Sequence, residues 1–104
     1  MSISIETTQN RYVVHIDGPL DAASAFDARQ KFEAVIEAGS APVDIDMTKA
    51  TFIDSSGVGA IVFIYKRLVL QGRAMTLQGL NGQPRDLIGM LRLDRTIPTT
   101  SLAA

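Results

Sequence analysis

Alternation of apolar and polar residues opens the chain. Ile3 and Ile5 alternate with polar neighbours, and residues 12–16 are mostly β-branched or aromatic, which predicts two strands. The Gln9-Asn10 pair between these segments is typical of a turn. The pattern therefore predicts an N-terminal β-hairpin.

Helical spacing replaces this alternation after Gly18-Pro19, a pair that we expect to interrupt the second strand. Between residues 22 and 38 the apolar residues fall on one face of a helix. Gly39 is suited to end that helix, because glycine adopts the left-handed cap conformation at little cost. The residues of this face are Ala25, Ala28, Phe32, Val35 and Ile36.

Two more strand–helix units follow. The order of elements favours right-handed crossovers and parallel neighbouring strands, because strands and helices alternate. We therefore expect an α/β fold in a single domain over residues 1–104, with one mixed sheet whose antiparallel part is the hairpin. The expected elements are a strand at 43–47, prolonged or followed by 51–53, a helix at 58–71, a strand at 74–78, a helix at 83–92, and, as the weakest element, a short strand after Thr96.

Composition narrows the function classes. Of the 104 residues, 46% are apolar, enough for one modest core. Ten basic and eleven acidic residues give a net charge of −1 with no basic stripe, so we expect no nucleic-acid partner. We also expect no direct membrane insertion and no secretory signal, because neither pattern is present. The absence of cysteine excludes disulfides, thiolate zinc sites and a cysteine nucleophile, and it fits the cytoplasm.

The segment with the most distinctive chemistry is TFIDSSGVG, residues 51–59, where a strand is expected to end and a helix to start. Asp and Ser are favoured helix caps, and two glycines in the first turn suggest that side chains there would be in the way. A helix N-terminus favours negative charge, so it could hold a phosphoserine of about −1.5 to −2 charge without rearranging. An ordinary capped helix, with glycines chosen for packing, explains the same residues.

Two motifs resemble the STAS domain family of anti-sigma-factor antagonists. They are DSSGVG at residues 54–59 and GPLD at residues 18–21, which is similar to that family's Gly-x-Leu-Asp element. The order and spacing of the expected elements match this family over essentially the whole chain. The resemblance implies a mixed sheet with helices packed mainly on one side. It also implies a non-enzymatic protein-binding domain that needs no cofactor.

The resemblance also implies a partner-switching cycle. The unphosphorylated domain, a monomer when free, would bind a serine kinase or anti-sigma factor of the ATPase type. That partner would phosphorylate Ser56, with Ser55 as the fallback acceptor, and a serine phosphatase would restore the hydroxyl. Asp21 would lie near the acceptor and Asp54 would shape the loop, with Gly57 and Gly59 supporting the motif. A plainer alternative for both aspartates is that they form a turn or cap a helix.

The second helix offers an independent candidate for partner binding. Its expected core face leaves Phe63 and Leu70 on another side, between Lys66 and Arg67 in angle and in line with Gly59. Exposed apolar residues beside charges suggest a docking strip, unless the third helix or a loop covers them. Phe26, off the core face of the first helix, is a weaker candidate. The expected core face consists of Val58, Ile61, Val62, Ile64, Tyr65, Leu68 and Val69.

Other function classes have less support. His15 is the only histidine, and we interpret it as structural. Asp44 and Asp46 could be imagined as metal ligands, but we expect them to point to solvent, and we predict no metal site. A hydrolase would need an activated nucleophile, and no base is evident. The main alternative is an accessory or scaffold subunit of a transporter, or a nucleotide-binding regulatory module, as some STAS-like proteins are.

Overall fold

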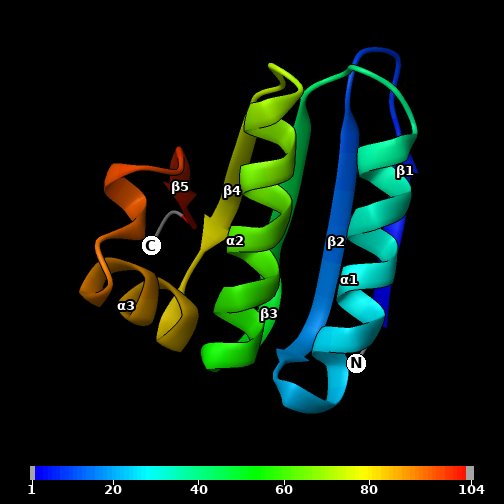
Figure 1. Ribbon diagram of the computed structural model, residues 1–104. Coiled ribbons are helices and arrows are strands. Elements are labelled where there is room, and N and C mark those ends of the chain that lie inside the picture. The colour runs from blue at the N-terminus through cyan, green and yellow to red at the C-terminus, as the bar shows by residue number, and fades with distance from the viewer. Residues whose placement is uncertain (1, 103–104) are drawn as a thin grey trace.

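The strands of the sheet lie side by side in the order in which they follow along the chain, β1-β2-β3-β4-β5 (Figure 1). The computed structural model describes residues 2–102. β1 is antiparallel to β2, and each later strand is parallel to its neighbour, which confirms the predicted mixed sheet and N-terminal hairpin. The elements are β1 Ser2–Thr7, β2 Tyr12–Leu20, α1 Ala22–Glu37, β3 Val43–Ile53, α2 Ser55–Leu70, β4 Met75–Leu80, α3 Gly82–Met90, a short 3-10 helix Leu93–Arg95 and β5 Thr99–Ser101.

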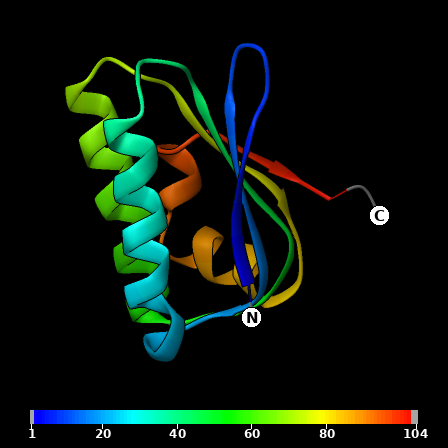
Figure 2. The ribbon, with the colours of Figure 1, turned by 90° about the vertical axis from the view of Figure 1, so that its right-hand side faces the viewer.

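The helices pack against one face of the sheet and leave the other face uncovered (Figure 2). α1 and α2 lie parallel to each other, because each follows one of the neighbouring parallel strands β2 and β3. The core fills the space between this helical layer and the sheet, and Phe32 of α1, which belongs to it, has no exposed surface. This two-layer arrangement agrees with the sequence-based expectation that the helices lie mainly on one side.

Several element boundaries differ from the prediction. β2 continues through Gly18-Pro19 to Leu20, because Gly18 adopts a φ of 97° and a register shift between Gly18 and Pro19 absorbs the irregularity. β3 is one strand from Val43 to Ile53, which is the first of the two options that the sequence allowed, whereas α2 begins at Ser55 rather than near residue 58. β2 and β3 therefore run without a break to the edge where the two helices begin.

Candidate phosphorylation and partner-binding site

The first turns of α1 and α2 meet at one edge of the sheet, which we call the helix-start edge and define by Asp21, Ala22, Asp54, Ser55 and Ser56. The carboxyl ends of β2 and β3 lie together there because the strands are parallel neighbours. Asp21 caps α1: its Oδ1 accepts hydrogen bonds from the backbone N–H groups of Ala23 and Ser24 at 3.1 and 3.2 Å. The Ser24 hydroxyl accepts from the Asp21 N–H at 2.9 Å, which completes a capping box.

Asp54 links the two helices. Its Oδ1 accepts from the Gly57 N–H at 3.0 Å and so caps α2, while its Oδ2 accepts from the Ala22 N–H at 3.1 Å, in the first turn of α1. One carboxylate therefore satisfies donors from both helices, and these N–H groups would otherwise lack partners. Asp21 and Asp54 are both caps, which is the plainer of the two roles that the sequence allowed.

The two glycines of the motif meet different surroundings. A Cβ on Gly57 would lie 2.2 Å from the carbonyl oxygen of Leu20, the last residue of β2. A Cβ on Gly59 would lie 3.5 Å from Nη2 of Arg29, an ordinary contact distance. The expectation that side chains would be in the way is therefore correct for Gly57, and Gly59 has room for a methyl group.

The two candidate acceptor residues both reach the surface, and their hydroxyls form no hydrogen bond within residues 2–102. Ser55 is exposed and Ser56 is partly exposed. Within residues 2–102, neither hydroxyl makes a hydrogen bond to another protein group. Ser56 precedes Phe63 by seven residues, close to two full helical turns, so the two residues lie on one side of α2. That side faces α1, because Arg29 of α1 stacks on the Phe63 ring.

The docking strip predicted on α2 requires correction. Phe63 is half-buried and packs against the core, rather than standing free, since the guanidinium groups of Arg29 and Arg67 lie 5.1 and 5.6 Å from its ring centroid. The sequence offers the third helix or a loop as a cover for this position, but the cover of Phe63 comes from α1. Arg29 itself was missed, because its position is polar and its partner lies on another helix.

The exposed apolar residues are distributed differently from the prediction. Leu70 is 84% exposed and Phe26 is 72% exposed, as expected. Val69, assigned to the core face, is 52% exposed, because the core face of α2 is narrower than predicted. Val69 and Leu70, with Tyr65 and Lys66, line an open hollow of about 360 Å³ on α2.

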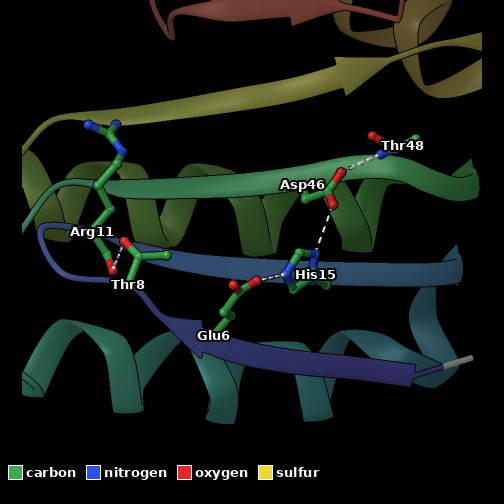
Figure 3. Close-up of polar contacts among 6 residues, drawn as sticks. All are labelled: Glu6, Thr8, Arg11, His15, Asp46 and Thr48. Carbon is green, nitrogen blue, oxygen red and sulfur yellow. Dashed lines mark hydrogen bonds and ion pairs between the residues drawn. The ribbon is translucent and has the colours of Figure 1, made fainter.

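The sheet face away from the helices carries a second group of polar residues, which we call the open face and define by Glu6, Arg11, His15, Asp44 and Asp46. His15 hydrogen-bonds Glu6 through Nε2 and Asp46 through Nδ1, each at 2.8 Å (Figure 3). The prediction that Asp44 points to solvent is wrong: its side chain is only 9% exposed and pairs with Arg11 at 2.7 Å. Within residues 2–102, no cluster of three or more His, Cys, Asp or Glu residues is suited to hold a metal ion.

Hydrogen bonding shifts the pKa values of this cluster. The hydrogen bond to Glu6 and then that to Asp46 raise the pKa of His15, and they outweigh its partial burial. Burial alone would raise the pKa of Asp46, but hydrogen bonds from Thr48 and His15 outweigh it and lower the pKa. His15 therefore joins β1 to β3 across β2, which is the structural role expected from the sequence.

Comparisons with known proteins decide the family. A family model for the STAS domain matches residues 2–103. The chain belongs to the STAS domain family. Among curated proteins, this STAS domain is similar to the anti-sigma-B factor antagonist of Bacillus subtilis, with 28% identity over 81 residues, 78% of this chain and 73% of that protein.

Solved structures extend the likeness to the whole fold. An anti-sigma factor antagonist from Mycobacterium paratuberculosis has 25% identity and a TM-score of 0.84, covering 94% of this chain and 83% of that one. The anti-sigma factor antagonist SpoIIAA in its unphosphorylated form has 20% identity and a TM-score of 0.74, covering 98% and 90%. These findings confirm the family and the fold that the two motifs and the element order indicated. In the part of the chain that the structure describes, no helix is long and apolar enough to cross a membrane.

Proposed function

We propose that this STAS domain is a non-enzymatic, phosphorylation-controlled protein-binding switch of the cytoplasm. The unmodified domain, a monomer when free, binds a serine kinase or anti-sigma factor of the ATPase type, and phosphorylation of Ser56 releases that partner. In the phosphorylation step the γ-phosphoryl group of ATP passes to Ser56 Oγ, the hydroxyl proton is released and ADP leaves. A serine phosphatase then hydrolyses the ester with water.

The observation that carries this proposal is that the helix-start edge is held together without its serines. Asp21 and Asp54 provide the caps, so a modified Ser56 would cost the scaffold no hydrogen bond. Ser56 is a partly exposed residue, and its hydroxyl makes no hydrogen bond to another group within residues 2–102. The first N–H groups of α2 favour an anion beside them. Modification can therefore change the surface while the fold stays intact.

The effect on a partner follows from charge. Phosphorylation adds about −1.5 to −2 units of charge at neutral pH. An acidic or apolar partner surface docked on this edge would then face repulsion and a desolvation cost, which weakens binding. The exposed Phe26 ring on α1, and the partly buried Phe63 ring between α1 and α2, supply apolar contact area on the helical layer that carries the acceptor.

The relatives support this assignment by their names. Proteins similar to this domain are anti-sigma factor antagonists, and SpoIIAA, which shares the fold, is known in both an unphosphorylated and a phosphorylated form. The comparison suggests the same kind of cycle for this chain.

Capture from native lysate tests the proposal. Wild type, Ser56→Ala and Ser56→Asp are compared, with Ser55→Ala and Ser55→Asp as matched controls one residue away. We expect Ser56→Ala to retain a kinase-type partner and Ser56→Asp to lose it, with phosphate found on Ser56 by mass spectrometry. Recovery of one transporter or nucleotide-binding partner equally by all variants would contradict the switch and favour an accessory subunit.

A further inference from the structure

The side chain of Arg29 crosses from α1 to α2 and lies near the proposed acceptor. Its guanidinium stacks on the Phe63 ring at 5.1 Å, and its Nη2 lies 3.5 Å from where a Cβ on Gly59 would be. Within residues 2–102, this guanidinium pairs with no carboxylate. Its charge is therefore available to an anion at the α1–α2 rim.

This guanidinium lies beside the position on α2 that follows Ser56 by about one helical turn. Gly59 follows Ser56 by three residues, and side chains at this spacing are neighbours on a helix surface, about 5–6 Å apart. Long side chains on helices point back toward the helix N-terminus, so the Arg29 stem is directed toward the helix-start edge. Because Gly59 has no side chain, nothing at that position blocks the flexible Arg29 side chain from turning toward a phosphate on Ser56.

The charges at the helix-start edge favour a cation beside a phosphate on Ser56. A phosphate on Ser56 would share the edge with the Asp21 and Asp54 carboxylates, which oppose a further negative charge. The N–H groups of the helix offset only part of this repulsion. An arginine guanidinium matches the geometry of a phosphate better than a point charge does, because it can donate two parallel hydrogen bonds.

We propose that Arg29 is the phosphate-pairing residue of this domain. In the unmodified form Arg29 covers the Phe63 ring. In the phosphorylated form it leaves the ring and pairs with the phosphate on Ser56. Phosphorylation thus changes two surface features together, since it adds an anion and removes one of the two guanidinium groups that stack on the Phe63 ring. This inference rests on the proposed function for the identity of the acceptor.

The test places phosphoserine at position 56 by genetic incorporation, so that it requires neither the kinase nor the partner. The second pKa of the phosphate, about 6 in the absence of neighbours, is measured by ³¹P NMR titration. The proteins are wild type, Arg29→Gln and Arg29→Lys. Arg67→Gln is the matched control, because Arg67 also stacks on Phe63 but lies eleven residues after Ser56 on α2.

We expect Arg29→Gln to raise the second phosphate pKa by roughly 0.5 to 1 unit relative to wild type. Arg29→Lys should raise it less, and Arg67→Gln should leave it unchanged. Phosphorylation of wild type should also shift the Arg29 Nε–Hε resonance downfield, because the group leaves the shielding region above the Phe63 ring; this readout needs no substitution. Identical phosphate pKa values in wild type and Arg29→Gln, with an unmoved Arg29 resonance, would overturn the inference.

A separate binding measurement distinguishes this inference from the proposed function. If the phosphate pKa depends on Arg29 but the partner binds phosphorylated and unmodified protein equally, the pairing stands and the switch fails. If the partner is released although Arg29 has no effect on the pKa, the switch stands and the pairing fails.

Discussion

The helix-start edge and the open face both display charged residues, but they use them differently. On the open face the charges satisfy one another: Arg11 pairs with Asp44, and His15 hydrogen-bonds both Glu6 and Asp46. At the helix-start edge Asp21 and Asp54 cap the two helices. Within residues 2–102, the Ser56 hydroxyl makes no hydrogen bond and the Arg29 guanidinium pairs with no carboxylate. The first arrangement stabilises the sheet, and the second leaves groups available for chemistry.

The charged residues that stabilise the fold and the residues expected to control partner binding therefore lie in different parts of the molecule. We expect substitutions on the open face to change the free energy of unfolding without changing partner binding. Substitutions of exposed residues around Ser56 should change partner binding without changing the free energy of unfolding. Gly57 is the exception, because the helix-start edge needs this residue for its packing.

The largest expected effect follows from adding a methyl group at Gly57. Gly57→Ala would place a Cβ 2.2 Å from the Leu20 carbonyl oxygen, a backbone atom that cannot move without shifting β2. We expect a loss of about 2–3 kcal/mol in the free energy of unfolding, measured by urea denaturation. Gly59→Ala is the matched control and should be neutral or stabilising by up to about 1 kcal/mol. Equal losses for both variants would mean that helix geometry, rather than the contact with Leu20, is responsible.

A smaller effect, on binding alone, is expected for Phe26→Ala. Phe26 is 72% exposed, so its removal should change the free energy of unfolding by no more than about 0.5 kcal/mol. If the ring is an anchor for the partner, the Kd should rise about tenfold, which is about 1.4 kcal/mol. Met90→Ala on α3, 79% exposed, is the matched control and should leave the Kd unchanged. An unchanged Kd for Phe26→Ala would remove this ring from the interface.

The smallest expected effect is the pH dependence of the stability that His15 and Asp46 on the open face contribute. The folded pKa of His15 is raised above 6.5, so its contribution to stability is full below about pH 6.5 and is lost as the pH rises through the folded pKa. The folded pKa of Asp46 is lowered from 3.8, so its contribution is present above that pH and is lost as the pH falls through the folded value. The stabilising effect of the cluster should therefore be largest between these limits.

Urea denaturation of wild type and His15→Gln across this range tests the prediction. The difference in unfolding free energy should be below about 1 kcal/mol near pH 5–6, because the groups are partly exposed, and should shrink near pH 9. Partner affinity at fixed pH should be the same for both proteins. A difference that grows with rising pH would contradict the assigned ion pairs.

The sequence predicted the elements better than the contacts between them. Periodicity identified the hairpin and both long helices, because these depend on local spacing. Periodicity predicts a break at Gly18-Pro19, but β2 continues there. A positive φ at Gly18 and a register shift in the β2–β3 pairing make this possible, and neither can be read from the pattern of apolar residues. Phe63 and Asp44 were assigned to solvent because Arg29 and Arg11, which cover them, are distant in sequence. The motif indicated Ser56, but the sharing of Asp54 between two helices depends on the adjacency of β2 and β3.

The central claim is that a phosphate at Ser56 weakens partner binding while the scaffold stays intact. The most direct measurement is the Kd of one captured partner for the unmodified domain and for the domain with phosphoserine incorporated at position 56, with phosphoserine at position 55 as the positional control. We predict a Kd at least about tenfold higher for the form modified at 56, a smaller change for the form modified at 55, and an unchanged far-UV circular dichroism spectrum. Equal Kd values for the unmodified and Ser56-phosphorylated domains would contradict the claim.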